Sequence, residues 1–209
     1  EGIRQAILVG DYAPNQRLVE ADLEEIYSAS RRNIRDALAR LTHEGLVETI
    51  PNKGARVRAV TIEEALDLAE ARLAMELLCL ERACKRATTK DIQEWRTVAE
   101  QLRLAVETGD IEGYTRHSTA LFDSYVRVAN QAVVRDILGR LRQQNIRFQS
   151  RVSYQKGWLA TSLPLRLGII DGLCAGDLSI AISNARAHHQ AWANTARQIP
   201  PRSATNLQN

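Results

Sequence analysis

The sequence predicts a mainly α-helical protein with two parts. Three helices and a two-stranded hairpin are expected within residues 1–60, and six or seven helices within residues 61–199. Two observations predict this fold class: apolar residues recur at helical spacing along most of the chain, and strand-like runs occur only between residues 46 and 60. We expect the polar segment 200–209 to be a flexible tail.

The first two helices are expected to be short. Ile3 and Ile7 stand at helical spacing and predict a helix that ends at Gly10. A second helix is expected over residues 19–27, and the turn Ser28–Ser30 follows it. The chain therefore places two short helices ahead of a third, longer one.

The third helix is expected over residues 31–43 and has an apolar and a basic side. Its apolar residues form one stripe, which must face a core: Ile34, Ala37, Leu38 and Leu41. Ser30 is expected to cap its N-terminus. Arg31, Arg32 and Arg35 lie together on the flank away from the stripe, so this helix presents a cluster of positive charge to solvent.

A hairpin with a basic tip is expected directly after this helix. Its strands cover residues 46–50 and 55–60, and the turn Pro51–Gly54 joins them. Lys53 and Arg56 give the tip a positive charge.

Together these elements predict a winged helix-turn-helix that binds DNA. The major groove is about 12 Å wide and admits one helix, whose first residues reach base edges. Arg31, Arg32 and Arg35 occupy those first positions, and Lys53 and Arg56 are placed for a second contact on phosphate or in the minor groove. The alternative is a solvated charged face. A formal net charge of +3 does not decide between them, but the basic hairpin beside the helix favours DNA binding.

The second part is expected to be purely helical. Thr61 and Thr88 each start a capping box, and Gly109-Asp110 and Gly176-Asp177 each mark the end of one helix and the cap of the next. Six helices are expected, roughly over 62–87, 89–107, 110–129, 131–153, 162–174 and 177–197.

Residues 7–60 resemble the winged helix-turn-helix of the GntR family of regulators. The resemblance is carried by Ile7-Leu8-Val9-Gly10 with Pro14, Leu18-Val19-Glu20, Leu23, Ser30-Arg31-Arg32-Asn33-Ile34-Arg35-Asp36-Ala37-Leu38, Leu41, Glu44-Gly45-Leu46-Val47 and Asn52-Lys53-Gly54-Ala55-Arg56-Val57. It implies that Ser30, Arg31, Arg32 and Arg35 contact DNA and that Gly54 sits in the wing tip. We add Asn33, Lys53 and Arg56 to the expected interface. The family often has arginine at position 21 and proline at position 33, so Ala21 removes one expected contact.

Residues 62–197 are similar to the FadR-type C-terminal domain, known as FCD. Arg72 and Glu76 resemble its opening R-x-x-x-E helix, and Gly176-Asp177 followed by Ala181 and His188 resembles its last helix. The resemblance implies a helical bundle that binds an effector and dimerises. The expected function is a ligand-responsive repressor that binds a palindromic operator as a homodimer. The alternatives are a metal-responsive regulator and a DNA-binding protein whose helical domain only dimerises.

Many FCD domains bind a divalent metal with one Asp and three His, and this sequence departs from that pattern. His117 stands at the usual Asp position, Leu121 and Arg166 stand at two usual His positions, and only His188 matches. A cavity metal needs three or four ligands, so a His-based site is short of donors. We therefore expect no metal cofactor.

An anionic effector suits the residues that are present. Arg72, Arg166, His117 and His188 are expected to face the effector, and an arginine fork matches a carboxylate, so a small organic acid is predicted. Two alternatives stay open. Arg72 can pair with Glu76 one turn later, and each histidine can be a core residue satisfied by one hydrogen bond.

Other features exclude several classes of protein. The three cysteines show no C-x-x-C spacing and are expected to be reduced core residues, and Trp95, Trp158 and Trp192 are expected to pack in the core. The sequence shows no run long enough for a membrane span, no signal-peptide layout, and no catalytic motif. We expect a soluble cytoplasmic protein that is not an enzyme.

Overall fold

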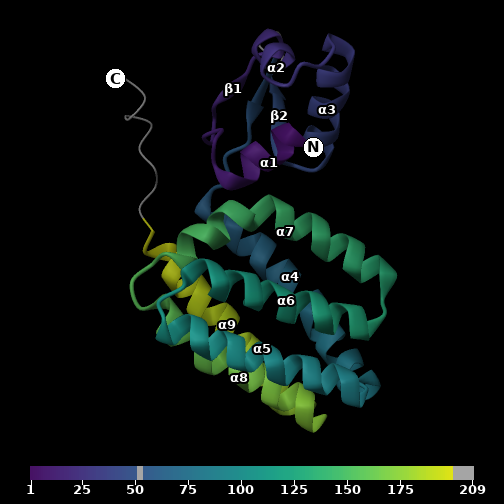
Figure 1. Cartoon of the computed structure of the whole chain (residues 1–209), viewed down its shortest axis with the longest axis vertical. Coiled ribbons are helices and arrows are strands. Elements are labelled where there is room, and N and C mark those ends of the chain that lie inside the picture. Colours follow the sequence, from purple (N-terminus) through teal and green to yellow (C-terminus); the bar gives the residue numbers. More distant parts are fainter. Residues whose placement is uncertain (51–53, 200–209) are drawn as a thin grey trace. The chain divides into compact units, whose positions relative to one another are not determined.

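The computed structural model describes residues 1–50 and 54–199, apart from the side chains of Ile146, Arg147 and Ser150 (Figure 1). The predicted contact residue Lys53 and the predicted tail 200–209 lie outside these ranges. The chain divides into two compact units, one with residues 1–68 and 139–148 and the other with the remainder. The boundary near residue 60 stays a prediction.

The N-terminal fold is three helices and a small sheet, as the sequence predicts. The helices are α1 (Gly2–Val9), α2 (Glu20–Ile26) and α3 (Arg31–His43). The strands are β1 (Arg17–Leu18), β2 (Val47–Ile50) and β3 (Gly54–Val57), in the order β1-β3-β2 with both pairs antiparallel. The β2–β3 hairpin is the predicted wing.

Two details of the sheet differ from the prediction. Strand β1 was not predicted, because two residues are too few to show the alternation of a strand, yet it pairs Arg17 with Arg56 and Leu18 with Ala55. The last strand ends at Val57 and not at Val60.

The core of this unit comes from the apolar side of each element. Ile3 and Ile7 of α1, Leu23 of α2 and Ile34 of α3 are buried in it. Gly10 ends α1 in the left-handed conformation that glycine adopts without strain. This packing fixes α3 with its basic flank outward.

The C-terminal part is all helical, with α4 (Ile62–Arg86), α5 (Thr89–Glu107), α6 (Ile111–Ala129), α7 (Ala132–Ser153), α8 (Trp158–Ala175) and α9 (Leu178–Arg197). Five of the six predicted helices agree in both bounds within about a residue. None of the helices in the described ranges is both long and apolar enough to cross a bilayer.

Helix α8 is the exception, because it begins at Trp158 and not at residue 162. Pro164 lies inside it, and a proline is usual only in the first turn of a helix, so the sequence suggests a later start. The earlier start places Ser162 inside the helix, one turn before Arg166. That position matters for the buried cluster described below.

The caps explain where these helices begin. Thr88 and Asp91 form the complete predicted capping box of α5, and Asp110 and Asp177 accept backbone hydrogen bonds at the starts of α6 and α9. Thr61 forms half of its box: it accepts from the Glu64 amide, but the Glu64 carboxylate pairs with an arginine instead.

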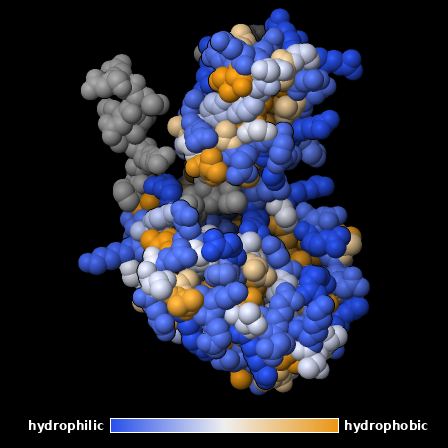
Figure 2. Space-filling model, in the orientation of Figure 1, coloured by the Kyte–Doolittle hydropathy of each residue, from blue (hydrophilic) through white to orange (hydrophobic). Residues whose placement is uncertain are grey.

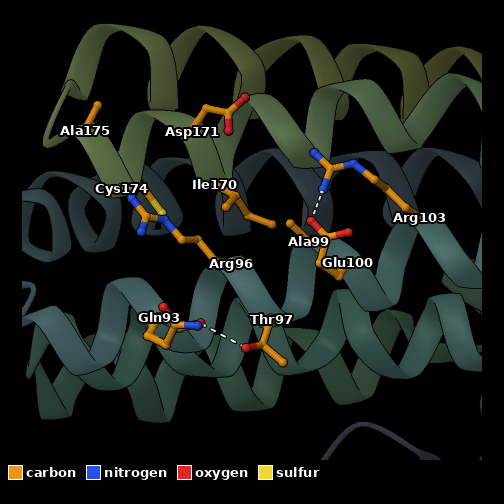
Figure 3. A pocket seen from close by; sticks show the side chains of 10 residues that line it. All are labelled: Gln93, Arg96, Thr97, Ala99, Glu100, Arg103, Ile170, Asp171, Cys174 and Ala175. Atoms are coloured by element: carbon orange, nitrogen blue, oxygen red, sulfur yellow. Dashed lines mark hydrogen bonds and ion pairs between the residues drawn. The ribbon is translucent and has the colours of Figure 1, made fainter.

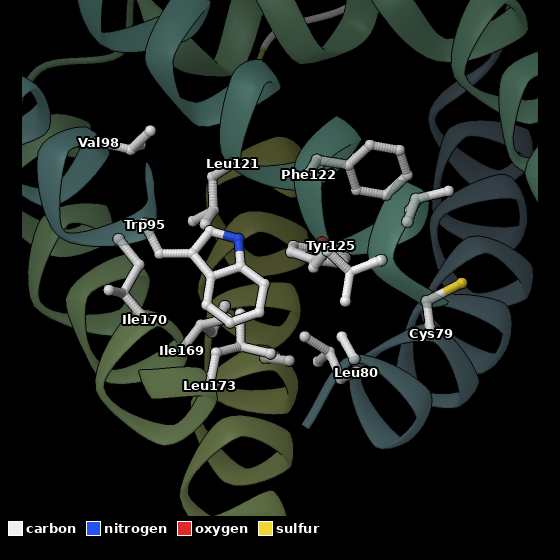
Figure 4. Close-up of a cluster of buried hydrophobic side chains, with 14 of the residues drawn as sticks. Cys79, Leu80, Trp95, Val98, Leu121, Phe122, Tyr125, Ile169, Ile170 and Leu173 are labelled. Carbon is white, nitrogen blue, oxygen red and sulfur yellow. The ribbon is translucent and has the colours of Figure 1, made fainter. Parts of the chain in front are cut away.

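The core of the bundle is built from facing helices. Trp95, Leu121 and Tyr125 gather in its interior (Figure 4), and the Trp95 indole donates a hydrogen bond of 2.8 Å to Ser124. Cys79 is buried there as a free thiol, and burial raises its pKa to about 11. Trp158 and Trp192 are also buried.

Candidate DNA interface and buried basic cluster

Helix α3 carries exposed arginines at its first residues. Ser30 caps the helix by accepting a hydrogen bond of 3.3 Å from the Asn33 amide. Arg31 and Arg35 point into solvent, with side chains 67% and 59% exposed, and Arg32 is exposed beside them. Because the core stripe holds the other side of the helix, this flank is free to enter a groove.

Glu20 of α2 joins two of these arginines. Its carboxylate accepts hydrogen bonds from the Nε atoms of Arg31 at 3.0 Å and of Arg35 at 2.9 Å. These contacts, with that from Arg35 first, hold the pKa of Glu20 below its usual range. Only Nε takes part, so the two Nη groups of each guanidinium stay in position for a bidentate contact. The sequence analysis assigned Glu20 no role.

The wing supplies a second basic position. Gly54 has a φ of +84° and no atom near the place of a Cβ, which suits an exposed turn. Arg56 of β3 pairs with Glu48 of β2, with 2.6 Å between Nε and Oε1, so the wing holds this arginine in place.

Three of the four predicted effector residues come together inside the bundle. Arg72 of α4, Arg166 of α8 and His188 of α9, called the basic cluster below, interact electrostatically, and both arginines act on the His188 ring. The Nε atoms of both arginines are buried and have no hydrogen-bond partner. A buried N–H donor without a partner is costly, so each one suggests a ligand atom or water.

His188 is held by a chain of buried hydroxyls. Its Nε2 atom lies 2.9 Å from the Ser162 Oγ atom, and the Tyr114 hydroxyl donates to the same Oγ at 2.7 Å. Burial first, and then the charges of Arg166 and Arg72, hold the pKa of His188 well below its usual range. The ring is therefore neutral at pH 7.

Glu76 does not pair with Arg72, which decides one of the open alternatives. The Glu76 carboxylate, 6% exposed, accepts a hydrogen bond from the Tyr125 hydroxyl. The Arg72 guanidinium lies over the Phe122 ring, 5.8 Å from its centroid, and that ring meets Tyr125 edge-on at 5.5 Å. Burial raises the pKa of Tyr125, which keeps the phenol protonated as a donor.

His117 stands apart from the basic cluster. It is half-buried on α6, one turn from Tyr114, and no hydrogen bond or ion pair joins it to the cluster within the described part of the chain. Leu121, one turn further along α6, is fully buried in the apolar core.

These surroundings do not fit a divalent metal. Leu121 offers no lone pair, the Arg166 charge repels a cation, and the His188 Nε2 atom already bonds Ser162. No group of three His, Cys, Asp or Glu residues with a ligating arrangement occurs among the described residues.

A separate polar groove of about 490 Å³ lies between α5 and α8 (Figure 3). Arg96, Glu100 and Arg103 line it from α5, and Asp171 and Cys174 from α8. Glu100 and Arg103 already pair at 2.7 Å.

The surface of the bundle on the face shown in Figure 2 is mostly hydrophilic, with apolar residues scattered over it.

An exposed basic helix with a wing, followed by a helical bundle with a basic cluster in its interior, is the arrangement expected of a DNA-binding regulator with an effector-binding domain. Comparisons agree with this class. The family model described as FCD domain matches residues 67–191, and the model of bacterial regulatory proteins of the gntR family matches residues 1–57. The chain belongs to the GntR family, in the branch that carries an FCD domain.

Individual relatives carry names of the same kind. The Nta operon transcriptional regulator of Aminobacter aminovorans is 37% identical over 81 residues, 39% of each chain. The HTH-type transcriptional repressor GlaR of Escherichia coli (strain K12) is 31% identical over 84 residues, 40% of this chain and 38% of GlaR. The matched segments thus span about two-fifths of these curated relatives. The solved structure of E. coli McbR/YncC shares the fold, with a TM-score of 0.77, 20% identity and 94% of both chains covered.

Proposed function

We propose that this protein is a transcription repressor that binds a palindromic operator as a homodimer and releases it when a small carboxylate binds its helical domain. The observation that carries the proposal is the pairing of an exposed basic recognition helix with a buried basic cluster in one chain. Family membership supports DNA binding and effector binding, and GlaR, a relative, is named a repressor.

The proposed DNA contacts follow from the interface geometry. Arg31 and Arg35 read base edges with their Nη groups, and Ser30, Arg32 and Asn33 contact the backbone or neighbouring bases from the same turn. The wing residues Lys53, Gly54 and Arg56 approach phosphate. A homodimer places two such helices on two half-sites, so the operator is palindromic.

The proposed effector site is the basic cluster without a metal. Arg72 and Arg166 bind the carboxylate with N–H groups that lack protein partners, and His188 orients it through a hydrogen bond. His117, half-buried on α6 one turn from Tyr114, contacts the remainder of the ligand. The ligand acts by binding one arrangement of the dimer more tightly than the other. The coupling free energy between effector binding and operator binding is then about 1–3 kcal/mol.

Calorimetry tests the effector role directly. The purified chain is titrated with a panel of small organic acids, and the best binder is repeated on Arg166→Ala and on Arg103→Ala, an exposed arginine on α5. Binding lost in the first variant and kept in the second is expected. Equal affinity in both would reject the arginine's role, and stoichiometric zinc or nickel in the purified protein would favour the metal-responsive alternative.

Two further measurements test the remaining parts. Sedimentation should give a dimer. A mobility-shift titration should show operator release on addition of the acid. Operator binding that no acid changes would favour the other alternative, a DNA-binding protein whose helical domain only dimerises.

A further inference from the structure

The net charge of the basic cluster and its neighbours indicates how many negative charges the ligand should carry. Arg72 and Arg166 carry two positive charges, and the Glu76 carboxylate beside them carries one negative charge. The titratable groups that interact electrostatically with these charges are neutral at pH 8: His188, His189, Tyr114 and Tyr125. The Ser162 hydroxyl, which bonds His188 and Tyr114, is neutral as well. The formal charges of the cluster and Glu76 therefore sum to one uncompensated positive charge.

Glu76 forms no ion pair with Arg72 or Arg166 in the described part of the chain. It is one helical turn from Arg72 on α4, and its carboxylate bonds the Tyr125 hydroxyl. The charges of Arg72, Arg166 and Glu76 all act on the Tyr125 hydroxyl, so these three side chains lie near one another. The Nε atoms of both arginines are buried and have no hydrogen-bond partner in the described part of the chain, so they are available to a ligand.

We propose that the basic cluster selects monoanionic carboxylates over dianionic ones of the same length and that Glu76 sets this preference. The inference rests on the proposed function, because it takes an acid as the effector. A monoanion brings the buried groups to zero net charge. A dianion leaves one negative charge uncompensated beside Glu76, and an uncompensated charge in a partly buried site is unfavourable.

The test uses the full-length chain in calorimetry at pH 8 and constant ionic strength. The probes are straight-chain acids of four to six carbons and the diacids of equal length. The monomethyl ester of each diacid is included, because it keeps the skeleton but carries one charge. We expect the monoacid and the monoester to bind about tenfold more tightly than the diacid, a moderate value because both arginine side chains are only half-buried.

Glu76→Gln provides the decisive variant. The amide keeps an oxygen that accepts from Tyr125, but the cluster then carries two uncompensated positive charges, so the preference should shift by about tenfold towards the diacid. Glu81→Gln makes the same charge change on the outer side of α4, where Glu81 pairs with Lys85 at 2.6 Å, and should leave the preference unchanged.

The outcomes separate the two proposals. A diacid that binds the wild type as tightly as its monoester overturns the selectivity while leaving acid binding intact. The role of Glu76 is overturned if Glu76→Gln and Glu81→Gln show the same preference between diacid and monoester. If none of these acids binds, or if Arg166→Ala binds them unchanged, the proposed function fails and the selectivity fails with it. The comparison of diacid and monoester on the wild type decides the question even if Glu76→Gln does not fold.

Discussion

The Oγ atom of Ser162 lies 2.9 Å from the Nε2 atom of His188, inside the helical bundle. The Tyr114 hydroxyl donates to the same oxygen, so the Ser162 proton is directed at Nε2 and the neutral ring carries its own proton on Nδ1. His188 is thus held as a neutral hydrogen-bonding group in one tautomer. Its behaviour differs from that of a solvent-exposed histidine in ways that can be measured.

Stability should fall in mild acid because of His188. Its pKa in the folded protein is well below the usual range, while the unfolded chain takes up a proton near pH 6.5. The contribution of neutral His188 to the free energy of unfolding is therefore fully present above about pH 6.5. It is lost as the pH falls towards the pKa of the folded state, at no more than about 1.4 kcal/mol per pH unit. Melting curves between pH 8 and 5.5 should show this slope, and His188→Gln should flatten it. Parallel curves would contradict the assignment.

Ser162→Ala should destabilise the bundle. It leaves the Tyr114 hydroxyl and the His188 Nε2 atom without a shared partner in a buried position, at a cost of about 1–3 kcal/mol. Ser179→Ala, on the exposed first turn of α9, should change stability by less than about 0.5 kcal/mol. Urea denaturation measures both, and an equal effect would mean that the hydroxyl chain contributes little.

Arg35→Ala should weaken binding to the specific operator by about 1–3 kcal/mol and weaken binding to random DNA much less. Arg56→Ala on the wing should weaken both evenly and reduce the salt dependence by about one phosphate contact. Filter binding at several salt concentrations distinguishes these patterns. Equal losses on both DNAs for Arg35→Ala would show that it does not read bases.

Glu20→Gln should raise affinity for random DNA and lower discrimination. The change removes a negative charge beside the phosphates and releases Arg31 and Arg35 from their shared anchor. A gain of about two- to fivefold on random DNA is expected at moderate salt. Glu25→Gln, an exposed position on α2, makes the same charge change without touching these arginines and should keep the discrimination of the wild type. Unaltered discrimination in Glu20→Gln would mean that the anchor does not orient the arginines.

Two glycines should respond in opposite directions to alanine. A Cβ at Gly172 of α8 would lie 2.4 Å from the Ala181 backbone nitrogen of α9, so Gly172→Ala should cost about 1–3 kcal/mol through overpacking. Gly139 is exposed on helix α7, with no atom within 4 Å of the same position. Gly139→Ala should stabilise the protein by about 0.4–1 kcal/mol. Thermal unfolding of both variants checks the prediction, and a neutral Gly172→Ala would show that α8 and α9 can separate at little cost.

The sequence was sufficient where local chemistry decides the structure. The helix bounds follow from caps such as Ser30 and Thr88, which act within one turn and are visible as single residues. Strand β1 and the start of α8 escaped prediction for the opposite reason. A two-residue strand depends on its partner β3. Pro164 is a residue usual in the first turn of a helix, yet it lies inside α8, well after the helix begins at Trp158.

The candidate sites show the same division. The sequence analysis placed Arg72, Arg166, His117 and His188 at one site, and the structure brings the two arginines and His188 together but not His117. The partners could not be predicted, because Glu20 and Arg35 are 15 residues apart and Tyr125 and Glu76 are 49 apart. Which of several carboxylates meets an arginine depends on how the helices pack. Arg72 illustrates the point, since Glu76, one helical turn later in the sequence, bonds a tyrosine of another helix.

Trp158 meets His188 edge-on, with 5.5 Å between the ring centroids. The indole thus lies against an imidazole whose pKa is lowered by burial and by the two arginines, and we expect its emission to depend on the polarity and protonation of that neighbour. We expect the proposed carboxylate, when it binds beside His188, to change both. Occupancy of the cluster should then be measurable from the intrinsic fluorescence of the protein without an attached dye.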